Sequence, residues 1–280
     1  MRRDGLFMKL LRNRKIMAGV TILLLFTLCG IFAPLLAPHD PYEVNPSIAY
    51  QFPLAGYPLG TDEFGRCIFS RILYGARLTL PLSLLSLAIA MVIGIPAGLL
   101  SGYYKPLDGV IMRLTDLFLA FPGMLLAIAI VAILGSGVYN VTIAVGLGTA
   151  PVFARLVRGE VLSLKQMPYV EAAKTSGASG WRIILLHILP NCLSTIAVFA
   201  AMQMAWIIMS MSTLSFLGMG AQAPSAEWGA MASGGKNYIG RALHISAFPV
   251  VFIFLSVLSF NMLGNGIRDA LDPRISDGNL

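Results

Sequence analysis

Charge is scarce in this chain. Charged residues make up 12% of its 280 positions and hydrophobic residues 57%, whereas a typical soluble domain has about 25% charged residues. The scarcity is also uneven, because five long runs contain no Asp, Glu, Lys or Arg. These runs are 16–39, 78–104, 117–154, 183–226 and 242–267. Since about 20 apolar residues cross a bilayer as a helix, the composition predicts a membrane protein.

Cysteine and histidine are also rare. The three cysteines, Cys29, Cys67 and Cys192, are odd in number and unevenly spaced, which argues against a disulfide framework or a zinc site. The three histidines show no metal-ligand or nucleophile spacing. Loose matches to nucleotide-binding motifs at 218–223 and 230–237 lack required residues or a preceding strand. We therefore expect no catalytic, cofactor-binding or metal-binding residues, which disfavours a membrane enzyme.

The uncharged runs predict six membrane-spanning helices. The run 117–154 is divided by the turn Gly135-Ser136-Gly137, and the end of the run 183–226 is too rich in Gly, Pro and polar groups to cross again. The expected spans are roughly 16–36, 79–102, 111–134, 139–161, 185–217 and 246–267. Together they predict an all-α integral membrane protein with one transmembrane domain, 16–267. An N-terminal segment, 1–15, a polar loop, 162–184, and a tail, 268–280, lie outside the bilayer.

The basic residues indicate the orientation. Six spans place both termini on one side, and that side collects 15 of the 20 Lys and Arg residues. The positive-inside rule makes this side cytoplasmic. The basic balance therefore reports topology, and we expect no nucleic-acid partner. The first apolar run reads as an anchor, because it is too long for a removable signal peptide and has no cleavage pattern. In segment 1–15, apolar residues alternate with basic ones, which fits either an amphipathic helix on the inner leaflet or a disordered tail.

Within the spans, glycine, proline and ionisable residues stand out. Gly94, Gly98 and Gly102 recur every fourth residue, a face that lets helix backbones approach closely. Prolines at 96, 122, 151 and 249 permit kinks. Arg113 and Asp116 lie three positions apart, so they can pair on one face of the third span. A stand-alone secondary transporter or channel would usually need acids deep in several spans, and only Asp116 comes close.

The loop 162–184 carries a short helix signal. Pro168 suits a first helical position, Gly177 suits a helix end, and Glu171 in the first turn is favoured by the helix dipole. Ala172 and Ala173 would give this helix a smooth, narrow surface that could enter a groove on another protein. The alternative is a surface helix without a partner.

The same loop resembles a known motif. The pattern Glu171-Ala-Ala-x-x-x-Gly177, followed by Leu189-Pro190, resembles the EAA loop of ABC importer permeases, although His187 stands where that loop normally has Ile. Nearly the whole chain resembles the C-type permease of dipeptide, oligopeptide and nickel importers. The other matching stretches are LGTDEFGR at 59–66, SR at 70–71, MRLTD at 112–116, ARLVR at 154–158, SFLGMGAQ at 215–222, EWG at 227–229 and RDALDP at 268–273. Two positions depart, because Cys67 and Asn265 stand where the family commonly has Asp.

The resemblance implies a type I importer permease in the bacterial inner (plasma) membrane. A paralogous permease would complete the translocation path, and a substrate-binding protein would dock on the outer face near 37–77 and 218–245. Two cytoplasmic ATPase subunits, which carry ATP and Mg, would each receive a coupling loop in a groove. In this chain the coupling residues would be Tyr169, Glu171, Ala172, Ala173, Gly177, Leu189 and Pro190.

The resemblance also suggests the cargo and the mechanism. Di- or oligopeptides are the expected cargo, with glutathione and nickel or a metal chelate as alternatives. ATP would close the ATPase pair, the coupling loops would move with it, and the bundle would alternate between two states that bind the nucleotide and the cargo differently. No cofactor is expected on this chain itself.

Overall fold

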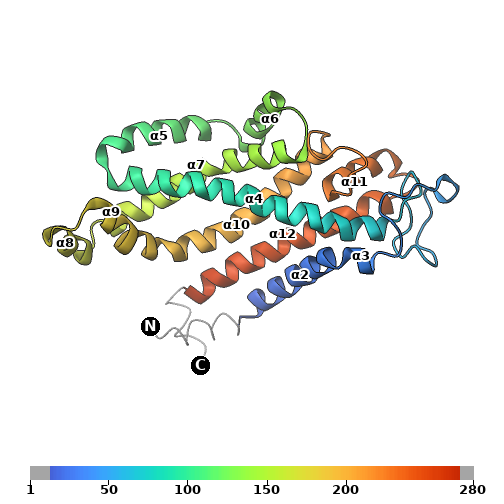
Figure 1. The fold of residues 1–280 in the computed structure, drawn as a ribbon, viewed down its shortest axis with the longest axis horizontal. Helices are drawn as coiled ribbons and strands as arrows, with labels where there is room; N and C mark the ends of the chain where they lie inside the picture. Colours follow the sequence, from blue (N-terminus) through green and yellow to red (C-terminus); the bar gives the residue numbers. More distant parts are fainter. Residues whose placement is uncertain (1–12, 272–280) are drawn as a thin grey trace.

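Residues 13–271 are described by the computed structural model, and helices dominate them (Figure 1). The helices are α2 (Arg14–Ile31), α3 (Ala33–Leu36), η1 (Pro46–Ile48), α4 (Ile68–Tyr103), α5 (Lys105–Leu119), α6 (Gly123–Leu134), α7 (Val138–Leu164), α8 (Pro168–Thr175), α9 (Gly180–Ile183), η2 (Ile184–Ile188), α10 (Leu189–Phe216), α11 (Trp228–Gly235), η3 (Lys236–Tyr238) and α12 (His244–Leu271). Extended pairing within the described range is limited to two isolated β-bridges. Five helical stretches are long and apolar enough to cross a bilayer, and the bent pair α5 and α6 makes a sixth if it counts as one span.

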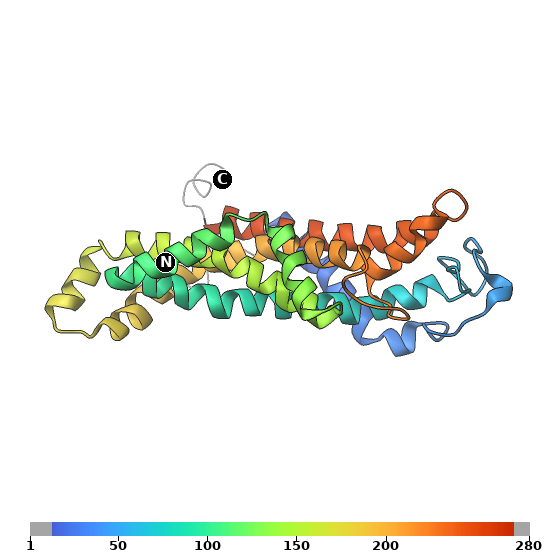
Figure 2. The same ribbon diagram turned by 90° about the horizontal axis from the view of Figure 1, so that it is seen from above.

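The long helices run side by side in an elongated bundle (Figures 1 and 2). α4 and α7 approach most closely, and the glycine face of α4 explains why. A Cβ atom on Gly94 or Gly98 would lie 2.5 or 2.6 Å from the carbonyl oxygens of Ala150 and Ala154, and one on Gly102 would lie 2.6 Å from Val161. Any larger side chain at these three positions would push the two backbones apart.

The third expected span is not one straight helix. α5 ends at Leu119, α6 begins at Gly123, and their axes differ by 92°. Pro122 lies in the break, where it lacks an N–H donor and disfavours helical backbone at the residue before it. The structure therefore turns the kink permitted by Pro122 into a sharp corner, in place of the continuous helix expected over 111–134.

Other helix bounds also differ from the expected spans. The first span is divided into α2 and α3, and the fifth begins with the π-helical turn η2, which directly follows α9. The start of α2 lies against the end of α12, where Lys15 pairs with Asp269 at 2.8 Å and the Asn13 amide donates to the Gly266 carbonyl. These two helix ends therefore lie on one side of the bundle. The interfacial helix considered for the N-terminal segment falls outside the described residues, as does most of the tail.

Three hydrophobic clusters follow one another along the bundle. One surrounds the fully buried Trp228 at the end that carries α11, one lies between α6, α7 and α10, and one lies beneath α8 and α9. The ends of the molecule are called here the α11 end and the α8 end; they lie at opposite extremes of the long axis (Figure 1).

Candidate functional site

α8 is a two-turn helix at the extreme of the bundle (Figure 1). Pro168 begins it, Glu171 lies in its first turn and Lys174 in its last, so both charges suit the helix dipole. Gly177 has a φ of +80°. Its N–H donates to the Lys174 carbonyl, and the next N–H donates to Ala173 at 3.1 Å. These bonds form a left-handed C-cap that favours glycine, as the sequence signals predicted.

One side chain anchors α8 to the bundle. Val170 has 0% of its surface exposed, and Ala173 packs partly against the same cluster. The buried members of this cluster come from α4, α7, α9, η2 and α10: Leu99, Val157, Val161, Ile183, Ile184, Ile188, Cys192 and Ile196. The hydrophobic cluster beneath α8 therefore includes residues of helices that cross the bundle. Because these residues are closely packed, a displacement of α8 would be transmitted to those helices.

The segments on either side of α8 are held by the end of α4. Lys165 donates to the Tyr103 carbonyl at 2.6 Å. A Cβ atom on Gly180 would lie 2.6 Å from the Tyr104 hydroxyl, so the turn packs closely against that side chain. The rings of Tyr104 and Trp181 lie 6.5 Å apart, edge to face. The loop is therefore fixed at its two ends and projects between them.

The outward side of α8 is exposed. Tyr169, Glu171, Ala172 and Gly177 are all exposed, whereas Ala173 is half-buried. The hydroxyl groups of Thr175 and Ser176 donate back to the Ala172 carbonyl. The Ala172 side chain is short beside the Glu171 carboxylate, and the longer side chains of Tyr169 and Lys174 are also exposed.

Leu189 and Pro190 lie apart from this exposed surface. They begin α10 directly after the π-helical turn η2, which contains His187. Leu189 packs against the cluster beneath α8, whereas Pro190 is exposed. π-helical turns are rare and concentrate at functional sites. Leu189 and Val170 therefore pack in the same hydrophobic cluster. Pro190 lies on α10 and is not part of α8.

The expected pair between Arg113 and Asp116 needs correction. Among the described residues, Asp116 pairs with Arg155 of α7, the Arg155 Nη2 atom lying 2.5 Å from Oδ1 of Asp116. A second pair joins Asp108 of α5 to Arg158 of α7, also at 2.5 Å. Spacing along α5 allowed the pair with Arg113, but α7 runs beside α5 and presents a guanidinium to each carboxylate.

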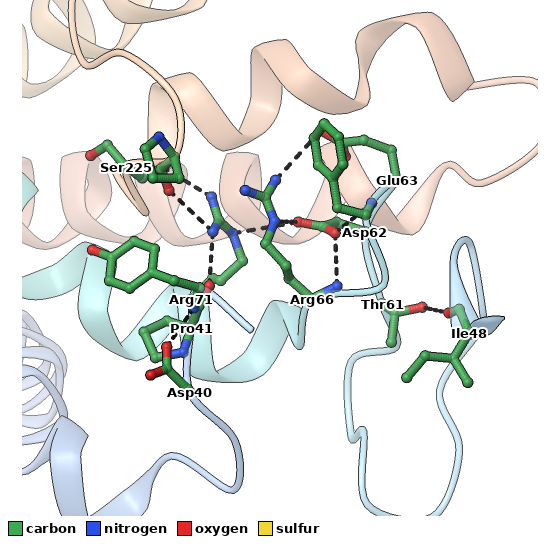
Figure 3. Close-up of polar contacts among 12 residues, drawn as sticks. Asp40, Pro41, Ile48, Thr61, Asp62, Glu63, Arg66, Arg71 and Ser225 are labelled. Carbon is green, nitrogen blue, oxygen red and sulfur yellow. Dashed lines mark hydrogen bonds and ion pairs between the residues drawn. The ribbon is translucent and has the colours of Figure 1, made fainter. Parts of the chain in front are cut away.

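At the α11 end, a buried ionic network ties three segments together (Figure 3). Arg71 at the start of α4 donates to the carbonyl oxygens of Pro41 at 2.9 Å, Pro224 at 3.3 Å and Ser225 at 2.9 Å. Asp62 lies 3.6 Å from Arg71 and accepts a bond from Arg66 Nε at 2.6 Å. Each of these three charged residues is at most 7% exposed, so the attraction between the carboxylate and the two guanidinium groups is little screened by water.

Two acidic residues near this network have raised pKa values. Burial raises the pKa of Glu63 from its ordinary value, and the neighbouring Asp62 raises it further. Burial also raises the pKa of Glu227, although the N–H groups of Gly229 and Ala230 donate to its carboxylate and oppose the shift. Glu227 thereby caps α11 and places Trp228, whose indole N–H donates to the Ile72 carbonyl at 3.0 Å.

Sequence reasoning missed the partners in these networks. Arg71, Arg155, Arg158 and Glu227 all fall in stretches that carried the family resemblance, but no local signal pairs Arg155 with a residue 39 positions away. Cys67, where the family commonly has Asp, is buried directly before α4, and Asn265, the other departure, is exposed on α12.

Comparison with known proteins assigns the family. Residues 76–277 match the family described as "Binding-protein-dependent transport system inner membrane component", and residues 5–53 match the N-terminal TM domain of oligopeptide transport permease C. The chain therefore belongs to the family of binding-protein-dependent transport system inner membrane components. The predicted C-type permease resemblance is confirmed.

Curated relatives cover almost the whole chain. The glutathione transport system permease protein GsiD of Pectobacterium atrosepticum is 46% identical over 92% of this chain and 86% of its own length. The dipeptide transport system permease protein DppC of Alkalihalophilus pseudofirmus is 46% identical over 96% of this chain and 89% of its own.

A solved structure shares the fold. An inward-facing conformation of the MetNI methionine ABC transporter superposes with a TM-score of 0.59 at 20% identity, over 72% of this chain and 97% of that one. The expected fold class, the all-α transmembrane domain of a type I ABC importer, is confirmed.

Proposed function

We propose that this chain is one of two permease subunits of an ATP-driven importer of short peptides in the bacterial inner membrane. The names of the relatives support this cargo, since one transports dipeptides and the other glutathione, itself a tripeptide. Both cargoes carry an ammonium group and at least one carboxylate. Nickel or a metal chelate is the alternative cargo to be tested beside them.

α8 would dock in a groove of a cytoplasmic ATPase subunit that binds ATP and Mg. The observation that supports this docking is the burial pattern of α8: Val170 is fully buried, whereas Glu171 and Ala172 are exposed. The partner subunit would hydrolyse ATP, and α8 of this chain would transmit the resulting movement to the bundle.

The remaining partners follow from the two-state mechanism. A paralogous permease would complete the path, and a substrate-binding protein would dock at the α11 end, on the loops held by Arg71. Nucleotide drives transport only if it binds the inward-open and outward-open states with different affinity. The hydrophobic cluster around Val170 would transmit the movement of α8 to α4, α7 and α10.

Two experiments test this proposal. The tagged chain, extracted gently from its native membrane, should co-purify with a second permease and ATPase chains, identified by mass spectrometry. Uptake of labelled dipeptide, glutathione and nickel by the same cells then identifies the cargo. Recovery of the chain alone, stable and competent for transport, would instead indicate a secondary transporter.

Variants of α8 test the coupling. Glu171→Lys and Gly177→Asp should lower uptake about tenfold or more, the scale of a hot-spot contact at an interface, with normal membrane insertion. Gln166→Lys, an exposed site just before α8, is the matched control and should retain uptake. Full uptake by normally expressed Glu171→Lys would contradict the docking role.

A further inference from the structure

One ion pair inside the membrane-spanning helices is open to its surroundings. The side chains of Asp116 and Arg155 are 63% and 56% exposed, although they bond at 2.5 Å. The neighbouring pair on the same two helices, Asp108 and Arg158, is only 27% and 31% exposed. Both pairs join α5 to α7, so the difference lies in what each pair faces.

The exposed pair lies at some depth. Arg155 is six residues before the end of the expected span 139–161, and Asp116 is five residues after the start of the expected span 111–134. At 1.5 Å per residue these distances are about 9 and 8 Å along the helices. Charged side chains are costly in hydrocarbon and almost always face the bundle interior or water. An exposed pair at this depth is therefore not explained by a lipid-facing position.

Two hollows that contain some polar groups lie near the pair. Val152, three residues before Arg155, lines a hollow of about 440 Å³ whose polar members are Thr149, Gln203 and Ser210. Leu156, next to Arg155, lines another of about 530 Å³ that contains Ser194, Thr195 and Arg268. The two hollows share Met202 of α10. A furrow with polar groups therefore follows α10 beside the pair.

The exposed surface of α2 is different. Beyond Lys15, its large exposed side chains are apolar, including Leu24 at 55%, Leu25 at 54% and Ile31 at 61%. No charged residue occurs between 16 and 31. This surface suits lipid, so the bundle has a lipid-like side and a furrowed side that carries charge.

We propose that the Asp116–Arg155 pair lines the translocation path and exchanges partners with the charged groups of the passing cargo. The ammonium group of a peptide would bind Asp116, and its carboxylate would bind the guanidinium fork of Arg155. Each cargo charge then finds a counter-charge where the hydrocarbon would otherwise exclude it. This inference rests on the proposed function.

Thiol labelling tests whether the pair faces water. In a chain whose native cysteines are replaced, Asp116→Cys, Arg155→Cys and the control Leu24→Cys are placed in the assembled importer. A charged methanethiosulfonate reagent reacts with the thiolate, which requires water, so the first two should react about tenfold or more faster than Leu24→Cys. Gln203→Cys probes the same furrow if the ion-pair variants do not assemble. Labelling no faster than Leu24→Cys, with and without ATP, would show that lipid or the partner permease covers the site.

Cargo charge tests the exchange of partners. Uptake of lysyl-alanine is compared with uptake of glutamyl-alanine. Asp116→Asn should lower this ratio and Arg155→Gln should raise it, each by about threefold, the effect of one exposed ion pair. The matched controls Asp108→Asn and Arg158→Gln should leave the ratio unchanged.

The outcomes separate the two proposals. If Asp116→Asn and Arg155→Gln move the ratio in the same direction or not at all, the pair is structural and this inference fails. If the wild-type importer takes up neither peptide, the proposed function fails instead.

Discussion

The two ends of the molecule are built in opposite ways. At the α11 end, Asp62, Arg66 and Arg71 are buried, and Arg71 ties α4 to two loops from distant parts of the chain. At the α8 end, the projecting helix is held mainly by Val170 and leaves most of its surface exposed. The α11 end is therefore held together by buried ion pairs, and the α8 end presents a helix that is anchored by few buried side chains. We infer that the α11 end keeps its shape while α8 is free to follow a partner.

Of the substitutions that test this difference between the two ends, removal of Arg71 should lower stability most. Arg71→Ala leaves Asp62 buried with less compensation and three carbonyl groups without their donor, so we expect a loss of about 3–5 kcal/mol. Thermal unfolding of the purified complex measures it. Arg77→Ala, an exposed arginine less than two turns further along α4, should change stability by less than about 0.5 kcal/mol. Equal effects of the two substitutions would contradict the structural role of the network.

Truncating the anchor of α8 should have a smaller and more local effect. Val170→Ala removes buried methyl groups, at a cost of about 2 kcal/mol. Because α8 projects from the bundle, we expect faster amide hydrogen exchange in α8 and lower uptake, with little change in the α11 end. Exchange that accelerates equally at both ends would show that the ends are not independent.

Gly177 and Gly159 should respond in opposite directions. Gly177→Ala places a side chain at a φ of +80° and should cost about 1 kcal/mol. Gly159 lies inside α7, and a Cβ atom added there would have open space within 4 Å beyond its own helix backbone. Gly159→Ala should therefore stabilise the protein by about 0.5–1 kcal/mol. Hydrogen exchange of α8 and α7 reports each change. Unchanged or slower exchange in α8 after Gly177→Ala would argue against the helix cap.

The smallest effect is a pH dependence at the α11 end. Because burial raises the folded-state pKa of Glu227, its folded form holds the proton to higher pH than the unfolded chain does. Stability from this group is therefore greatest below the ordinary Glu range and falls as pH rises through the raised pKa. Melting temperatures measured between about pH 5 and 8 should fall less steeply in Glu227→Gln than in the wild type. Parallel curves would contradict the shift; Glu63, shifted in the same direction, remains in both.

Local sequence signals predicted much of the site. Pro168, Glu171 and Gly177 predicted the start, first turn and end of α8, because helix capping depends on residues a few positions apart. The glycines at 94, 98 and 102 predicted close packing, and the structure supplies the partner, α7. The orientation of the chain in the bilayer and the docking of α8 stay predictions.

Hydropathy and capping are properties of neighbouring residues, and so the sequence by itself determined the apolar helices, the α8 helix and the family. Only the tertiary structure decided the 92° corner between α5 and α6, the choice of Arg155 over Arg113 as partner of Asp116, and the tie between Arg71 and the loop at 224–225. An ion pair forms with whichever opposite charge the packing brings within reach. That choice depends on how helices far apart in sequence lie together, which no local pattern records.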